Sequence, residues 1–162
     1  MAHGPIVPPL AARGHLALSE PELIEWGERF GNAVRPPLIL TLTGELGTGK
    51  TTLVRAICAG YGVEEDVTSP TFAIVHEYAS PRSPVFHLDL YRLAGPADLA
   101  NLGWDEIMTA EALVLIEWPE RAGEELPADH VPISLQYLPG QPDRRLLYAG
   151  GHVAGAGSGP AS

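Results

Sequence analysis

The segment 44–51 carries the clearest chemical pattern in the sequence, because Gly44-Glu45-Leu46-Gly47-Thr48-Gly49-Lys50-Thr51 matches G-x-x-x-x-G-K-[ST]. Glycines let backbone amides turn toward a polyphosphate, and the lysine ammonium reaches its β and γ phosphates. The threonine hydroxyl is a ligand for Mg²⁺. The pattern predicts a loop that binds ATP with Mg²⁺, the alternative being a glycine-rich turn without nucleotide. The predicted nucleotide-binding residues here are Glu45, Leu46, Gly47, Thr48, Gly49, Lys50, Thr51 and Thr52.

Lys50 is the only lysine among ten basic residues, the other nine being arginine. A sequence that otherwise uses arginine throughout indicates that position 50 needs a compact ammonium instead of a planar guanidinium. Phosphate binding by a loop of this kind has that requirement, so we predict a catalytic role for Lys50.

Two carboxylates are candidates to complete a magnesium site. Glu117 directly follows the apolar run Leu113–Ile116, which places it at the carboxyl end of a strand beside a neighbouring phosphate loop. We predict that Glu117 and Thr51 bind the metal, although a solvent-facing carboxylate is the alternative for Glu117. Asp89 lies near the end of another predicted strand and is a candidate to orient water, or else forms a structural hydrogen bond to Arg92 or a loop.

Three further features are less specific. His87 shares a strand face with Asp89, and a core histidine is the favoured interpretation. The segment 69–71, Ser-Pro-Thr, is equally compatible with a loop that senses the γ phosphate and with a plain proline turn. For Trp118-Pro119, packing is favoured over a wall of the nucleotide site or a partner surface.

The elements around these residues follow from hydrophobic spacing. The run Leu38–Thr43 predicts a buried strand before the loop, and a helix is expected from Lys50 to Ala59, ended by Gly60. Ser19 and Glu22 form a predicted capping box that opens an earlier helix, with Gly31 and the following prolines ending it. Further strands are expected at 15–18, 71–78, 85–91, 113–116, 131–138 and 145–149, the second with the third and the last two pairing as hairpins, with short helices at 96–102 and 104–110.

Composition narrows the class of protein. A chain of 162 residues, 45% hydrophobic and 19% charged, suits a single domain, which we place at 1–149, with 1–14 as a loose extension and 150–162 as a disordered tail. No apolar run approaches the roughly 18 residues of a membrane span. The single cysteine, Cys58, fits a reducing compartment and a core position, so we expect a cytoplasmic protein. The net charge of −10 argues against direct nucleic-acid binding.

Taken together, four segments resemble the TsaE (YjeE) family, the bacterial ATPases of tRNA threonylcarbamoyladenosine synthesis. They are the loop 44–52, Ser-Pro-Thr-Phe at 69–72, His-Leu-Asp-Leu-Tyr-Arg-Leu at 87–93 and Ile-Glu-Trp-Pro-Glu at 116–120. The resemblance covers about residues 15 to 149. Small departures are Glu45, where the family often has Asp, and Thr48, where it often has Ala.

The resemblance implies an α/β fold of the P-loop NTPase type, with three layers and a mixed parallel and antiparallel sheet. It implies weak ATP hydrolysis, with Thr51 and Glu117 on magnesium, Asp89 needed for hydrolysis, and Glu20 and Glu120 bordering the nucleotide. It also implies partners similar to TsaD and TsaB, so that tRNA is reached only through their complex and no membrane is involved.

Two alternatives remain open. A small-molecule kinase uses the same loop but needs arginines that clamp the transferred phosphate, and Arg82 and Arg92 between the loop helix and Glu117 do not cluster. A nucleotide-gated adaptor without catalysis would share every site residue. No Asn-Lys-x-Asp pattern for guanine is present, which slightly favours adenine.

Overall fold

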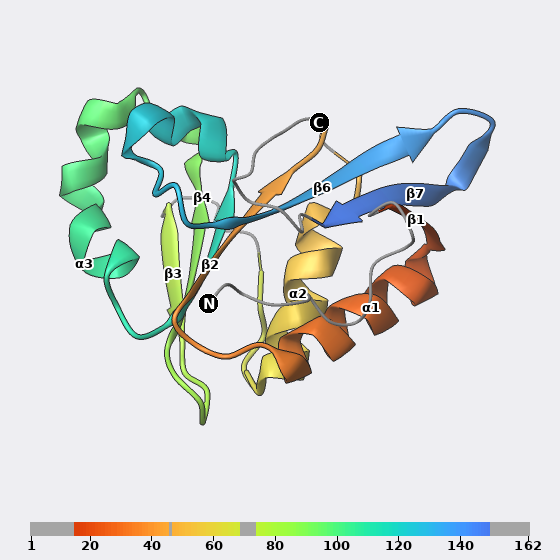
Figure 1. The fold of residues 1–162 in the computed structure, drawn as a ribbon, viewed down its shortest axis with the longest axis horizontal. Coiled ribbons are helices and arrows are strands. Elements are labelled where there is room, and N and C mark those ends of the chain that lie inside the picture. Colours follow the sequence, from red (N-terminus) through yellow and green to blue (C-terminus); the bar gives the residue numbers. More distant parts are fainter. Residues whose placement is uncertain (1–14, 46, 69–73, 150–162) are drawn as a thin grey trace.

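The computed structural model describes residues 15–45, 47–68 and 74–149. Within them, strands form one sheet in the order β1-β7-β6-β2-β5-β4-β3 (Figure 1). Strands β6, β2, β5 and β4 run parallel, whereas β7, β1 and β3 join antiparallel at the flanks. The predicted α/β fold with a mixed sheet is therefore confirmed. The predictions for Leu46, for 1–14, for 69–71 and for 150–162 fall outside the described residues.

The element bounds follow the predicted order along the chain. The strands are β1 His15–Ser19, β2 Leu38–Thr43, β3 Val75–Tyr78, β4 Val85–Asp89, β5 Leu113–Glu117, β6 Val131–Leu138 and β7 Gln141–Ala149. The helices are α1 Glu20–Ala33, α2 Lys50–Tyr61 and α3 Trp104–Met108, with 3-10 helices η1 Leu90–Arg92, η2 Pro96–Leu102 and η3 Pro119–Glu125.

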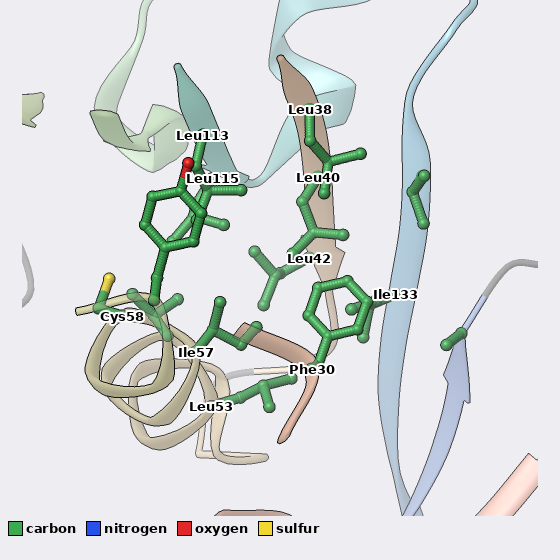
Figure 2. Packing of buried hydrophobic residues seen from close by; sticks show 14 of the residues in the cluster. Phe30, Leu38, Leu40, Leu42, Leu53, Ile57, Cys58, Leu113, Leu115 and Ile133 are labelled. Carbon is green, nitrogen blue, oxygen red and sulfur yellow. The ribbon is translucent and has the colours of Figure 1, made fainter. Parts of the chain in front are cut away.

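The alternation of β5 explains why the domain has three layers. Leu113 and Leu115 pack on the side of α1 and α2, where Figure 2 shows them facing Ile57 and Cys58 of α2. Val114 and Ile116 point to the opposite face and pack with residues of η2, α3 and η3. A strand buried on both faces reads as a continuous apolar run, which is what the sequence has here.

Helix α1 begins with the predicted capping box. The Glu22 amide donates to the Ser19 hydroxyl at 3.4 Å, and the Ser19 amide donates to the Glu22 carboxylate at 2.8 Å. Leu23, Trp26 and Phe30 then bury one face against α2 and the sheet. Helix α1 thereby starts at a fixed position next to β1, beside the loop that precedes α2.

Two glycines predicted to end helices lie inside them instead. Helix α1 continues past Gly31 to Ala33, and α2 continues past Gly60 to Tyr61, where Gly62 with φ 107° provides the cap. A Cβ on Gly31 would lie 2.0 Å from the Ile57 carbonyl oxygen, and one on Gly60 would lie 2.0 Å from that of Glu28. These glycines permit α1 and α2 to pack backbone to backbone, a long-range requirement that local sequence does not reveal.

We expect Gly31→Ala and Gly60→Ala each to lower the free energy of unfolding by roughly 1–3 kcal/mol, because the added methyl meets helix backbone that cannot move independently. For a chain of this size the melting temperature should fall by about 2–4 °C per kcal/mol. Thermal unfolding followed by circular dichroism checks this. Gly95→Ala is the matched control, since no atom lies within 4 Å of its Cβ position. Equal melting of all three variants would refute the close-packing role.

Several strands and helices begin or end at residues other than the predicted ones. Strand β4 stops at Asp89 instead of Tyr91, because the Asp89 side chain caps the 3-10 turn η1. Strand β3 begins at Val75, β7 begins earlier than predicted, at Gln141, and α3 ends at Met108. The two predicted hairpins, β3 with β4 and β6 with β7, are both present.

Cys58, on α2, lies fully buried in the hydrophobic core, as predicted. Burial raises the pKa of its thiol to about 12, so the reactive thiolate is suppressed. Within the described part of the chain, none of the helices has the length and apolar character needed to cross a membrane.

Candidate nucleotide site

The segment after β2 turns directly into helix α2 at Gly49, whose φ of 106° is a left-handed conformation that favours glycine. Gly49 has no side chain with which to cap this helix start, and the first turn of α2 contains no acidic residue. The first amides of α2 therefore lack intrahelical partners, and the helix dipole adds positive character. Such a helix start is suited to bind a phosphate.

The interior of the loop is held by Thr48, which is 1% exposed. Its hydroxyl donates to the Glu45 carbonyl at 2.7 Å, and its amide donates to the same oxygen at 3.2 Å. A Cβ on Gly44 would lie 2.6 Å from the Leu135 carbonyl oxygen and 2.7 Å from the Thr48 hydroxyl. The threonine found in place of the common alanine thus closes the loop turn with its side chain.

Lys50 begins α2 and is only 6% exposed. Its ammonium donates to the Gly44 carbonyl and lies 4.1 Å from the centre of the Trp118 ring. Trp118 has a φ of 58°, unusual for a non-glycine residue, and its ring also contacts Tyr91 at 4.9 Å between centroids. Trp118 packs against the core cluster on the face of η2, α3 and η3, as favoured from the sequence, and its ring also contacts the Lys50 ammonium.

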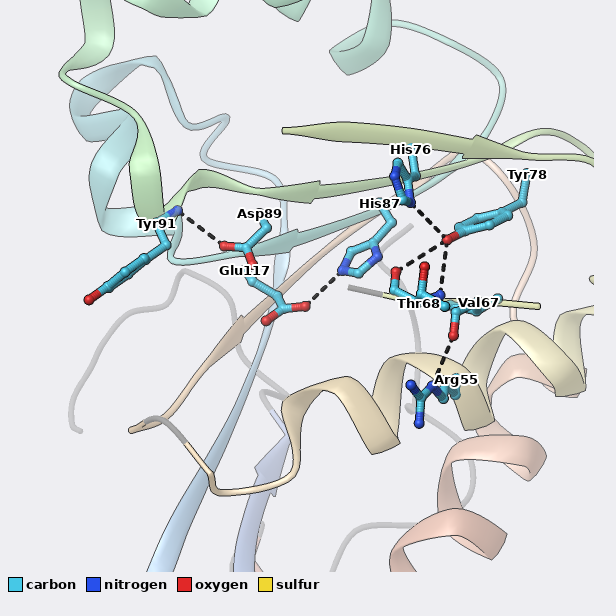
Figure 3. A network of polar contacts seen from close by, with 9 residues as sticks. All are labelled: Arg55, Val67, Thr68, His76, Tyr78, His87, Asp89, Tyr91 and Glu117. Carbon is cyan, nitrogen blue, oxygen red and sulfur yellow. Dashed lines mark hydrogen bonds and ion pairs between the residues drawn. The ribbon is translucent and has the colours of Figure 1, made fainter. Parts of the chain in front are cut away.

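Glu117 and Asp89 end neighbouring strands at the same edge of the sheet. Glu117 lies opposite Leu42 of β2 and opposite Asp89 of β4, so both carboxylates lie beside the loop that follows β2. Glu117 is 3% exposed, which excludes the solvent-facing alternative. Its Oε2 lies 2.7 Å from Nε2 of His87. Figure 3 marks this contact with a dashed line.

Asp89 is half-buried, and its Oδ1 accepts a hydrogen bond from the Tyr91 amide at 3.1 Å. This is the structural bond to a following loop that the sequence left open as an alternative. Burial raises the pKa of the Asp89 carboxyl, the Tyr91 hydrogen bond opposes this, the Glu117 charge adds to it, and the charges of His87 and Lys50 oppose it. Asp89 therefore lies within electrostatic reach of both Glu117 and Lys50.

The oxygen atoms available near the loop are of the kind that bind magnesium. A hydroxyl from Thr51 and a carboxylate from Glu117 are hard oxygen ligands, and two carboxylates ending adjacent strands favour a cation nearby. No group of three or more His, Cys, Asp or Glu side chains that would cage a metal occurs among the residues placed by the structure. Magnesium commonly takes one or two protein carboxylates and completes its shell with substrate phosphates and water, so this sparse set suits it.

A cleft of about 500 Å³ opens on the other side of the loop. Glu20 lines this cleft together with the loop, whereas Glu120 is exposed on η3 and is not among the lining residues. The sequence did not identify the contributions of β1 and β7, because only the antiparallel pairing of these strands carries them to the loop. The lining residues are Leu18, Ser19, Glu20, Pro21, Leu23, Gly47, Thr48, Gly49, Thr52, Pro142, Asp143 and Arg145.

Comparison with known proteins agrees with this arrangement. The family model described as threonylcarbamoyl adenosine biosynthesis protein TsaE matches residues 17–146. The tRNA threonylcarbamoyladenosine biosynthesis protein TsaE of Treponema pallidum is 36% identical over 120 residues, covering 74% of this chain and 88% of that protein. The protein of the same name from Streptomyces coelicolor is 40% identical over 110 residues, covering 66% and 74%.

Among solved structures, the crystal structure of Bacillus subtilis YdiB matches with a TM-score of 0.69 and 28% sequence identity. The match covers 83% of this chain and 84% of YdiB. The loop 44–51, the Asp89 and Glu117 carboxylates and strands β2 to β6 lie in the matched region 17–146. The chain belongs to the TsaE family of threonylcarbamoyladenosine biosynthesis proteins.

Proposed function

We propose that this chain is a weak Mg²⁺-dependent ATPase of the cytoplasm, required for threonylcarbamoyladenosine modification of tRNA and acting with TsaD-like and TsaB-like proteins. The observation that carries the proposal is the start of α2 at the left-handed Gly49, with the buried Lys50 side chain and the Glu117 carboxylate on the same side of the sheet. Positive groups for a triphosphate and oxygen ligands for its metal thus lie together at the carboxyl ends of neighbouring parallel strands.

In this proposal each residue has a separate task. The amides of the loop and the Lys50 ammonium bind the β and γ phosphates, while the cleft beside Glu20 receives the nucleoside. Thr51 and Glu117 hold magnesium, which when bound neutralises charge on the phosphates. Asp89 orients the attacking water and accepts its proton as the water oxygen bonds to the γ phosphorus and ADP leaves.

The charge of the chain supports the indirect role in tRNA modification. With a net charge of −10, the domain repels a polyanion, so tRNA binding belongs to the partners. For the kinase alternative, Arg82 donates to the Gly31 carbonyl and Arg121 to the Leu93 carbonyl, while Arg145 is the one arginine among the lining residues of the cleft. These described arginines do not form a clamp around the cleft.

Phosphate release from ATP, measured with and without the partner proteins, tests the proposal. We expect stimulation by the partners, and we expect Asp89→Ala and Glu117→Ala to remove it while ATP binding stays measurable by calorimetry. Undiminished release in both variants would favour the adaptor. Transfer of labelled γ phosphate to a small acceptor, instead of release as free phosphate, would favour the kinase.

A further inference from the structure

His87 is a buried polar side chain that packing alone does not explain. It is 0% exposed in the middle of β4, and its Nδ1 has no hydrogen-bond partner among the residues that the structure describes. Burying a ring nitrogen without a hydrogen-bond partner destabilises the folded state. Its neighbours on the same face, Val85 and the cross-strand Leu115, are fully buried aliphatic residues. An aliphatic side chain would therefore suit this position better if only the core mattered.

Among the residues that the structure places, the His87 ring makes its hydrogen bond with Glu117. Nε2 lies 2.7 Å from Oε2, and since a carboxylate only accepts, the imidazole donates. His76, directly opposite on β3, does not share this contact, because its Nδ1 lies 3.1 Å from the Tyr78 hydroxyl instead. The second oxygen of Glu117 points away from the imidazole in Figure 3. One carboxylate oxygen is thus fixed, and the other is presented at the end of β5.

We propose that His87 is a positioning residue that orients the Glu117 carboxylate for the magnesium of the bound nucleotide, an inference that rests on the proposed function. The Nε2 proton holds Oε2 and thereby sets the side-chain torsion of Glu117, leaving the other oxygen for the metal. Hydrogen bonds of this kind to a metal-binding carboxylate commonly change metal affinity by 10–100-fold. The buried imidazole is then explained by its function, because it fixes the geometry of a metal ligand.

The test compares His87→Gln with His87→Asn, two neutral amides that differ in reach. The glutamine amide nitrogen extends to about the position of Nε2 and keeps a donor for Glu117, whereas the asparagine amide stops near the position of Nδ1. Calorimetry measures the affinity for a non-hydrolysable ATP analogue with and without Mg²⁺. We expect the gain in affinity from Mg²⁺ to stay within about threefold of the native value in His87→Gln and to fall by 10–100-fold in His87→Asn. Affinity without Mg²⁺ should be the same in both.

A double variant shows whether His87 acts through Glu117. In a Glu117→Gln background, His87→Asn should cause no further loss of the Mg²⁺ gain, because the residue it positions no longer binds the metal. An additional loss of tenfold or more would overturn the proposal. So would equal Mg²⁺ gains in His87→Gln and His87→Asn.

The outcomes separate this inference from the proposed function. If the native protein shows no Mg²⁺-dependent nucleotide binding, the proposed function fails. If it does and His87→Gln loses the Mg²⁺ gain as His87→Asn does, only the positioning role fails. Thermal melting is recorded alongside, because His87→Asn leaves the buried Glu117 carboxylate without its partner. Should that variant unfold, loss of the Mg²⁺ gain in His87→Gln would still overturn the proposal, and the two His87 variants are then compared in the Glu117→Gln background, where no carboxylate is left without its partner.

Discussion

Replacing Lys50 by alanine is expected to weaken ATP binding by about a hundredfold. A hydrogen bond between charged groups contributes roughly 1.5–3 kcal/mol, and each 1.4 kcal/mol is tenfold in affinity. Lys50 is 6% exposed, so the attraction of its charge to phosphate is little screened by solvent. Calorimetry with Mg-ATP measures the loss, and far-ultraviolet circular dichroism checks that the fold is kept.

Lys50→Arg is the informative comparison, since it keeps the charge. The ammonium lies between the Gly44 carbonyl and the Trp118 ring, a space that a planar guanidinium does not fit without moving one of them. We therefore expect Lys50→Arg to lose at least tenfold in affinity. Native affinity in Lys50→Arg would show that the compact ammonium is not what the position requires. Native affinity in Lys50→Ala would remove the basis of the ATP-binding proposal.

The loop and its flanking elements were predictable because their signals are local. The strand Leu38–Thr43, the loop glycines and the apolar face of α2 follow one another within 25 residues. The capping box at Ser19 is likewise a local pattern, and the structure contains both of its hydrogen bonds. Neither the loop nor the box needs a distant residue to form.

Features that depend on distant contacts were not predictable. Gly31 and Gly60 look like helix ends in isolation, but their missing side chains are required by a neighbouring helix. The Lys50–Trp118 contact and the His87–Glu117 hydrogen bond join residues 68 and 30 positions apart, and only the strand order brings each pair together. The cleft beside Glu20 depends in the same way on β7 pairing with β1.

Asp89→Asn is expected to reduce partner-stimulated phosphate release by about a hundredfold or more, the usual contribution of a positioned general base. Binding of Mg-ATP should change by no more than a few fold, because the phosphates are held by the loop and Lys50. Release is measured at saturating ATP with the partner proteins present. A raised pKa makes the Asp89 carboxylate a better proton acceptor than an exposed one, provided that it is ionised.

The choice of asparagine decides between the two roles open to Asp89. Its side-chain oxygen still accepts the hydrogen bond of the Tyr91 amide, so the cap of η1 is kept, whereas the basic carboxylate is lost. Asp89→Ala loses both. If Asp89 served only as a cap, Asp89→Asn would hydrolyse ATP at the native rate and Asp89→Ala alone would be impaired. If Asp89 acts on water, both variants lose ATP hydrolysis to the same extent. Only Asp89→Ala is then also less stable, by about 1 kcal/mol in the free energy of unfolding, because it loses the cap.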